Sequence, residues 1–84
     1  MKTISISEYE EKMGQLISLS NIEDYVEIKG SIHMDIRKLL DNPWKYLDKD
    51  KTYYFYCENG SRSRRAVRIL SSYGFNVVKV TTNE

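Results

Sequence analysis

The stretch that decides the fold of this 84-residue chain is Tyr53-Tyr54-Phe55-Tyr56-Cys57-Glu58-Asn59-Gly60-Ser61-Arg62-Ser63-Arg64-Arg65. It begins with a continuous aromatic run, which predicts a buried strand over residues 52–56. The only cysteine of the chain follows this run directly, and a helical pattern begins at Ser61 or Arg62. Cys57 is therefore expected in a short loop between the end of a buried strand and the start of a helix.

The helix after this loop is predicted over residues 61–73. Its apolar residues Ala66, Ile69, Leu70 and Tyr73 recur at the i, i+3, i+4 and i+7 spacing of one helix face. Gly74 is the residue type that ends helices, so the helix should stop there. Residues 75–80 then have the apolar composition of a closing strand.

Short strand and helix patterns also alternate upstream of the aromatic run. Strands are predicted over residues 3–6, 15–20 and 30–34, and helices over residues 7–13, 21–25 and 36–40, with a further turn that begins at Pro43. Ser7 and Glu10 have the spacing of a capping box, and Asp35 is a typical cap. Such alternation predicts an α/β domain whose strands are parallel, with helices on both faces of the sheet. Ligands of such sheets bind beyond the carboxyl ends of the strands, where the Cys57 loop is expected.

Length and composition fit one globular domain over residues 1–84, with 40% hydrophobic and 30% charged residues. No apolar run approaches the ~18 residues of a membrane span, and residues 1–5 lack the apolar core of a secretion signal. One cysteine forms no internal disulfide, which fits a reducing compartment. We therefore expect a cytoplasmic protein, monomeric and without a membrane partner.

The net charge is only +1, but the charge is unevenly distributed. Residues 62–68 carry four arginines and no acid, whereas residues 8–27 carry six acids and one lysine. A local basic stretch in a near-neutral chain favours a small-anion site, so no nucleic-acid partner is expected. One cysteine and one histidine do not make a metal-ligand cluster, so no metal is expected either.

The surroundings of Cys57 favour its thiolate form. Backbone N–H groups at a helix start are unsatisfied, and the helix dipole adds positive charge there. Arg62, Arg64 and Arg65 lie within eight residues of the thiol, and Gly60 permits a turn that a Cβ would hinder. We interpret Cys57 as a reactive thiol rather than a small buried hydrophobe, which is the more common role of a free cysteine.

The chain resembles the single-domain rhodanese (sulfurtransferase) family along nearly its whole length. Its loop Cys57-Glu58-Asn59-Gly60-Ser61-Arg62-Ser63 matches the family pattern Cys-x-x-Gly-x-Arg-Ser. The stretch Ile28-Lys29-Gly30-Ser31-Ile32-His33-Met34 is similar to the family's His-Ile-x-Gly-Ala-Ile-Asn, and Ala66 with Gly74-Phe75-x-x-Val78 resembles its helix and closing strand. The resemblance implies a small three-layer fold, with a central parallel sheet of four to five strands and short helices on both faces.

The resemblance also implies sulfur transfer without a cofactor. Cys57 would be the catalytic residue: it would take a sulfane sulfur from a small anionic donor such as thiosulfate and pass it to a thiol, a protein acceptor or cyanide. The implied substrate-binding residues are Glu58, Asn59, Gly60, Ser61, Arg62 and Ser63. Their backbone N–H groups would surround the outer sulfur as a nest, and Arg62 would bind the anionic donor.

Two departures from the family pattern favour an alternative function. Ser18-Leu19-Ser20 stands where the family usually has Asp-Val-Arg, and Glu58 stands where thiosulfate-using members often carry arginine. A negative charge therefore lies beside the expected anion. The alternative is a non-catalytic rhodanese-like domain that acts as a persulfide carrier or a regulatory binding module.

A cysteine phosphatase or arsenate reductase is the other alternative, because these enzymes also hold a thiolate in an anion-binding loop. Their loops place five residues between the cysteine and the arginine, whereas four separate Cys57 from Arg62. The shorter loop makes a smaller cradle, better suited to one sulfur atom than to a phosphoryl group.

Overall fold

A computed structural model describes residues 1–20 and 28–82 of the chain. Within these residues five strands form one sheet, every neighbouring pair is parallel, and the strand order is β1-β5-β4-β2-β3. The strands are β1 (Thr3–Ser5), β2 (Gln15–Ser18), β3 (Ser31–His33), β4 (Thr52–Tyr56) and β5 (Asn76–Thr81). The predicted α/β class and the parallel sheet are confirmed.

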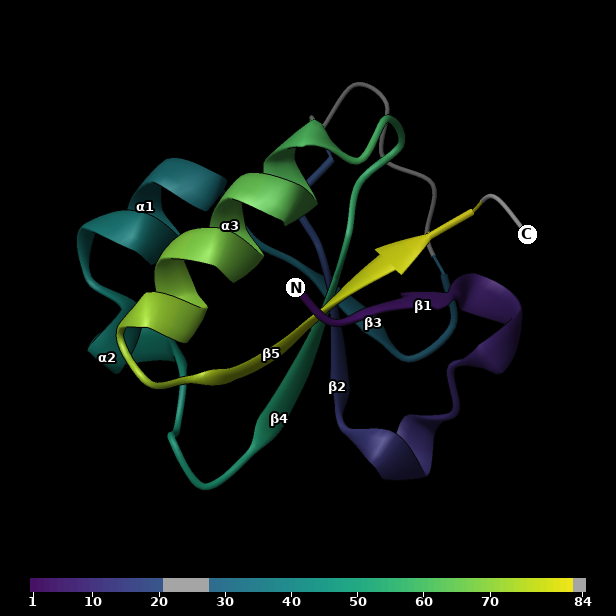
Figure 1. The fold of residues 1–84 in the computed structure, drawn as a ribbon, viewed down its shortest axis with the longest axis horizontal. Helices are drawn as coiled ribbons and strands as arrows, with labels where there is room; N and C mark the ends of the chain where they lie inside the picture. Colours follow the sequence, from purple (N-terminus) through teal and green to yellow (C-terminus); the bar gives the residue numbers. More distant parts are fainter. Residues whose placement is uncertain (21–27, 83–84) are drawn as a thin grey trace.

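Helices cover both faces of the sheet, but the two faces carry different kinds. The α-helices α1 (Ile36–Asp41), α2 (Pro43–Tyr46) and α3 (Ser61–Ser72) lie on one face. The 3₁₀-helices η1 (Ile6–Glu8) and η2 (Glu11–Met13) lie on the other, where Figure 1 shows them on the side opposite α3. The sheet is therefore the middle of three layers, as the resemblance implied.

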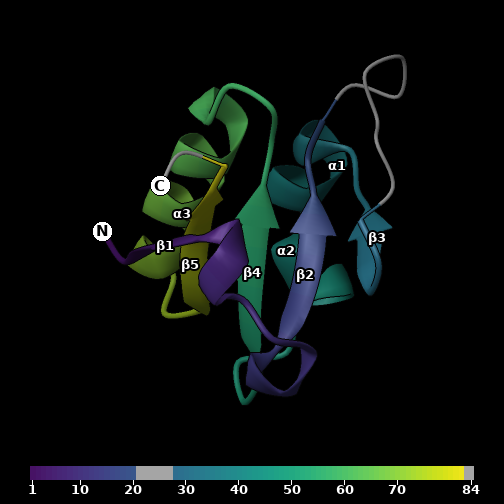
Figure 2. The same cartoon turned by 90° about the vertical axis from the view of Figure 1, so that its right-hand side faces the viewer.

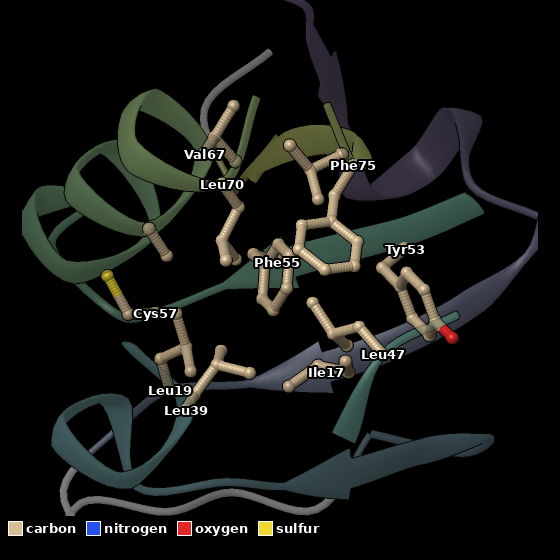
Figure 3. Close-up of a cluster of buried hydrophobic side chains, with 12 residues drawn as sticks. Ile17, Leu19, Leu39, Leu47, Tyr53, Phe55, Cys57, Val67, Leu70 and Phe75 are labelled. Atoms are coloured by element: carbon tan, nitrogen blue, oxygen red, sulfur yellow. The ribbon is translucent and has the colours of Figure 1, made fainter. Parts of the chain in front are cut away.

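The aromatic run of β4 lies at the centre of both cores. Tyr53 and Phe55 point toward the α-helices, whereas Tyr54 packs on the other face with Leu16 and Val80. Figure 3 shows Phe55 in the middle of the larger core, between residues of α3 and of β2. A central parallel strand is covered on both faces, so its sequence is continuously apolar rather than alternating.

Helix α3 has the predicted extent, and its buried face overlaps the predicted apolar stripe at Ala66 and Leu70. Its buried residues are Ser63, Ala66, Val67 and Leu70, which all face the sheet. Tyr73 from the predicted stripe is 45% exposed, because its ring lies outside the core. There it stacks on Trp44 of α2, with ring centroids 5.7 Å apart.

The predicted helix over residues 7–13 is wrong in detail, because two 3₁₀ turns occupy this segment. The capping box is formed by Ser5 and Glu8, two residues earlier than the predicted pair, and the Ser5 N–H donates to Glu8 Oε1 at 2.9 Å. Tyr9 is extended between the two turns. Its ring packs against Tyr54 at 5.3 Å and its hydroxyl donates to the Gly14 carbonyl, contacts that a continuous helix would not allow.

The predicted starts of the next two helices are confirmed. Asp35 caps α1 by accepting the Arg37 N–H at 2.8 Å, and Pro43 begins α2. The helix predicted over residues 21–25 lies outside the described residues. Among residues 1–20 and 28–82, no helix combines the length and the apolar character that a membrane crossing requires.

Candidate functional site

The Cys57 loop lies where the carboxyl ends of three neighbouring strands meet. Figure 2 shows β4 running up into this loop, which turns back into α3, with β2 and β3 beside it pointing the same way. Two backbone hydrogen bonds join the strand ends: the Leu19 N–H donates to Tyr56 O at 2.8 Å, and the Met34 N–H donates to Ser18 O at 3.0 Å. The parallel topology thus brings the segments after β2, β3 and β4 to one edge of the sheet.

The Cys57 side chain is only 3% exposed, and its sulfur lies against the first turn of α3. The Ser63 N–H donates to Cys57 Sγ at 3.4 Å. The thiol also has two acceptors, Ser63 Oγ at 3.6 Å and Asn59 Oδ1 at 3.8 Å. A helix-start N–H group is thus directed at the sulfur, as the sequence pattern predicted, and it stabilises negative charge there.

The loop takes its shape from Asn59 and Gly60. Gly60 is the N-cap of α3 and has a φ of 81°, in the left-handed region that favours glycine. Because Gly60 has no side chain, the Asn59 side chain caps the helix instead. Its Oδ1 accepts from Ser61 N at 3.1 Å and from Ser61 Oγ at 2.9 Å. Ser63 closes the turn by donating its hydroxyl to Gly60 O at 3.1 Å. Five of the residues predicted for the site, Cys57, Asn59, Gly60, Ser61 and Ser63, therefore form one hydrogen-bonded loop.

The two charged residues of the loop bind each other. Arg62 Nη1 lies 3.2 Å from Glu58 Oε1, and both side chains remain partly exposed. The Ser20 hydroxyl hydrogen-bonds to the Glu58 carboxylate, and this bond, the backbone N–H of Glu58 and the charge of Arg62 together lower the pKa of Glu58. Arg62, which the sequence suggested as the binder of an anionic donor, thus already has an anionic partner within the chain.

The sequence reasoning missed one neighbour of the loop, Lys79, but it had marked Ser20 as the residue that stands where the family usually has arginine. Ser20 follows β2, the strand next to β4, and hydrogen-bonds to Glu58. Lys79 of β5 lies under the loop, with its Nζ 3.3 Å from the position that a Cβ on Gly60 would occupy. Lys79 is the only charged residue of β5, and a charge in such an apolar strand is the signal that would have drawn attention to it.

A cleft of about 630 Å³ lies next to the loop. It is lined by the end of β2, the β3–α1 connection and the first turns of α3, with the residues Leu19, Ser20, His33, Met34, Asp35, Ile36, Arg37, Ser61, Arg62 and Arg65. His33 forms part of its wall, and its Nε2 lies 2.7 Å from Ser20 O. Arg64 and Arg68 are exposed on the outer side of α3 and line a different groove.

The family described as "Rhodanese-like domain" matches residues 5–83, almost the whole sequence. The chain therefore belongs to the rhodanese-like domain family. None of the curated proteins compared with the chain matches it. The match covers the Cys57 loop and every strand of the sheet from β2 onward.

Solved structures of several proteins are similar to this fold. A rhodanese-related protein from Thermoplasma volcanium is 31% identical, with a TM-score of 0.81 over 95% of this chain and 83% of that one. A protein from Staphylococcus saprophyticus is 26% identical, with a TM-score of 0.82 over 95% and 86%. The chain also matches 14% of an NAD-dependent persulfide reductase from A. fulgidus, at 28% identity and a TM-score of 0.73 over 94% of this chain.

Proposed function

We propose that this protein is a sulfurtransferase that carries sulfane sulfur as a persulfide on Cys57. The observation that carries the proposal is the hydrogen bond from the Ser63 N–H, in the first turn of α3, to the Cys57 sulfur. It supports a thiolate without a metal ion. Gly60 adds the left-handed turn of the loop, and Lys79 adds a cation close to Gly60.

The reaction has two displacements on sulfur. The Cys57 thiolate attacks the outer sulfur of the donor, the donor's S–S bond breaks, and its electron pair leaves with the rest of the donor (sulfite when the donor is thiosulfate). An acceptor thiolate then attacks the outer sulfur of the Cys57 persulfide, and the electron pair of that S–S bond returns to Cys57. No electron is gained or lost overall, so the residues need only stabilise negative charge.

The ion pair between Glu58 and Arg62 favours donors with less charge than thiosulfate. A dianion that approaches Arg62 must compete with the Glu58 carboxylate, which lies 3.2 Å from the guanidinium and is held by Ser20. An organic persulfide carries at most one negative charge on its sulfur atoms and therefore competes less with the Glu58 carboxylate. The persulfide reductase from A. fulgidus, which contains a similar domain, agrees with such a donor.

The test is to load Cys57 with sulfur and to measure the mass of the intact protein by mass spectrometry. After incubation with inorganic polysulfide, and separately with thiosulfate, the intact protein should gain the mass of one sulfur atom, and dithiothreitol should remove it. Cys57→Ser is the control and should gain nothing. Absence of the adduct with both donors would overturn the proposal, and hydrolysis of p-nitrophenyl phosphate would favour the phosphatase alternative.

A persulfide carrier or regulatory module is the second candidate. The neutral residues Ser18 and Ser20 at the end of β2, together with the burial of Cys57, favour it over a fast enzyme. The two candidates differ in the second displacement. Rapid release of the loaded sulfur to cyanide or to small thiols supports the enzyme, whereas a persulfide that stays on Cys57 in their presence supports the carrier.

A further inference from the structure

The outer face of α3 carries a basic groove that sulfur transfer on Cys57 does not use. The groove has a volume of about 350 Å³ and is lined by Ser61, Arg64, Arg65, Arg68 and Ile69. Its three arginines are exposed. Figure 1 shows that α3 and α1 form the outer layer on one side of the sheet, so the side of α3 opposite its buried residues is directed outward. We call this feature the arginine groove.

No negative charge balances the arginine groove. Within residues 1–20 and 28–82, Arg64, Arg65 and Arg68 form no ion pair, and no acid is among the described residues that line the groove. The sequence itself has no aspartate or glutamate between Glu58 and Glu84. The three guanidinium groups therefore have donors left for an external anion.

The positions of these arginines are unfavourable for the helix itself. Arg64 and Arg68 are four residues apart and Arg65 and Arg68 are three apart, spacings at which like charges destabilise a helix. The last turn of α3, where cations would be stabilising, contains no basic residue. Local stability rules are broken mainly where function requires it, so the cluster indicates a binding surface.

The residue types of the groove favour carboxylates as its ligands. Four of the five arginines of the chain lie at residues 62–68, and none of its eight lysines does. Lysine would serve a solvated surface equally well, whereas arginine binds a carboxylate or a phosphate with two parallel hydrogen bonds. A nucleic-acid surface is usually strongly basic and offers aromatic rings for stacking. This chain has a net charge of only +1, and the described lining of the groove contains the aliphatic Ile69 but no aromatic ring.

We propose that the arginine groove binds an acidic segment of a partner protein. The Cβ atoms of residues four apart on a helix are about 5–6 Å from each other, so Arg64 and Arg68 fit two carboxylates of similar separation. A partner helix with glutamates four residues apart presents such a pair, and an aliphatic side chain of the same helix packs on Ile69. Ser61 lines the groove and also belongs to the Cys57 loop, so the bound segment lies next to that loop.

The test is an NMR titration with a synthetic helical peptide whose ends are capped. The peptide carries glutamates four residues apart with a leucine between them, and the control peptide has glutamine in place of every glutamate. The glutamate peptide should cause saturable shifts at the amides of residues 61–69, and the control peptide should cause none. Arg64→Gln/Arg68→Gln should weaken the affinity about tenfold, the effect of losing charge-assisted hydrogen bonds.

Lys45→Gln/Lys49→Gln is the matched control, because it removes the same charge from a groove at the other end of α3, where Trp44 stacks on Tyr73. Charges more than about 10 Å away are largely screened at 0.1 M salt, so the affinity should change less than about twofold. Equal losses in the two double variants would mean attraction to net charge alone and would overturn the proposal. Absence of shifts at millimolar glutamate peptide would overturn it as well.

Two further measurements distinguish an acidic protein segment from other occupants. An oligothymidylate of similar charge should bind more weakly than the glutamate peptide at the same salt concentration. Tighter binding of the oligothymidylate that Arg64→Gln/Arg68→Gln removes would assign the groove to nucleic acid and overturn the proposal. Sedimentation of the protein alone should show a monomer. Self-association that the same double variant abolishes would identify a second copy of this chain as the occupant, against the proposal.

Discussion

The two ends of helix α3 satisfy their backbone hydrogen-bonding groups in different ways. At its carboxyl end Gly74 has a φ of 91°, the Gly74 N–H donates to Ser71 O at 3.0 Å, and the Phe75 N–H donates to Leu70 O at 3.1 Å. This is the Schellman pattern, which satisfies the last carbonyls of a helix. Trp44 stacks on Tyr73 beside it. The carboxyl end is therefore built for stability.

The amino end is arranged differently. Its N-cap Gly60 has no side chain, so Asn59 caps the Ser61 N–H from outside the helix. The first turn contains Arg62 and no acid, although a cation is unfavourable at the positive end of a helix dipole. The Ser63 N–H is directed at the sulfur of Cys57 instead. Departures from local stability rules gather at functional sites. The difference between the two ends agrees with the proposed role of Cys57, because a backbone N–H at the amino end is left to stabilise negative charge on the sulfur.

The largest effect on stability is expected in the middle of the helix. Leu70 is fully buried, so Leu70→Ala should lower the free energy of unfolding by about 2–5 kcal/mol. Arg68→Ala, an exposed change two residues away, should alter it by about 0.5 kcal/mol or less. Urea unfolding measures both. Similar losses for the two variants would contradict the packing of α3 on the sheet.

A matched pair of glycine variants tests the comparison of the two ends directly. Gly60→Ala and Gly74→Ala both place a side chain at positive φ, and each new Cβ would approach a lysine Nζ, at 3.3 Å for Lys79 and 3.4 Å for Lys49. Each should cost about 1–2 kcal/mol of stability. Only Gly60→Ala should also slow the alkylation of Cys57 by iodoacetamide, because only that turn shapes the loop around the sulfur. Equal slowing by Gly74→Ala would refute the division of roles.

The Glu58–Arg62 pair should control the use of thiosulfate. Glu58→Gln releases Arg62 for the donor, so KM for thiosulfate should fall about two- to fivefold, the range of a partly exposed ion pair. Persulfide formation at several thiosulfate concentrations measures this. Glu10→Gln, which breaks the surface pair with Lys12, is the control and should have no effect. An unchanged or higher KM for Glu58→Gln would remove this pair from donor selection.

The smallest effect is the pH dependence of the same ion pair. The pKa of Glu58 lies below its ordinary value of 4.5, first through the Ser20 hydrogen bond, so the carboxylate stabilises the folded state fully at pH values above 4.5. This contribution is lost as the pH falls through the lower, folded-state pKa. The free-energy gap between the parent and Glu58→Gln should therefore shrink on acidification, by less than about 1 kcal/mol for so exposed a pair. Urea unfolding at neutral and acidic pH would show a constant gap if Glu58 were not paired.

The parts of the fold that depend on local signals were predictable from the sequence. The extent of β4, the cap at Asp35 and the stop at Gly74 depend on residues within a few positions of one another. The segment around Tyr9 was predicted wrongly, because the extended Tyr9 packs against Tyr54, far away in the sequence. Helix propensity depends on the local sequence, so it does not account for a contact between residues that are far apart in the chain.

The same distinction applies to the site. The loop from Cys57 to Ser63 was predictable because its spacing is local, and the parallel topology placed it at the carboxyl edge of the sheet. Ser20 and Lys79 reach the loop from other strands. The spacing of Glu58 and Arg62 is that of an i, i+4 helix pair, but only the structure shows that they bind each other.

The most direct test of the central claim is a single turnover on Cys57. Protein loaded with polysulfide, freed of excess donor and mixed with cyanide should lose its extra sulfur and release an equal amount of thiocyanate. Cys57→Ser, treated in the same way, should release none. A parent protein that never gains the sulfur, or a Cys57→Ser variant that yields as much thiocyanate, would contradict a persulfide on Cys57 as the basis of this protein's function.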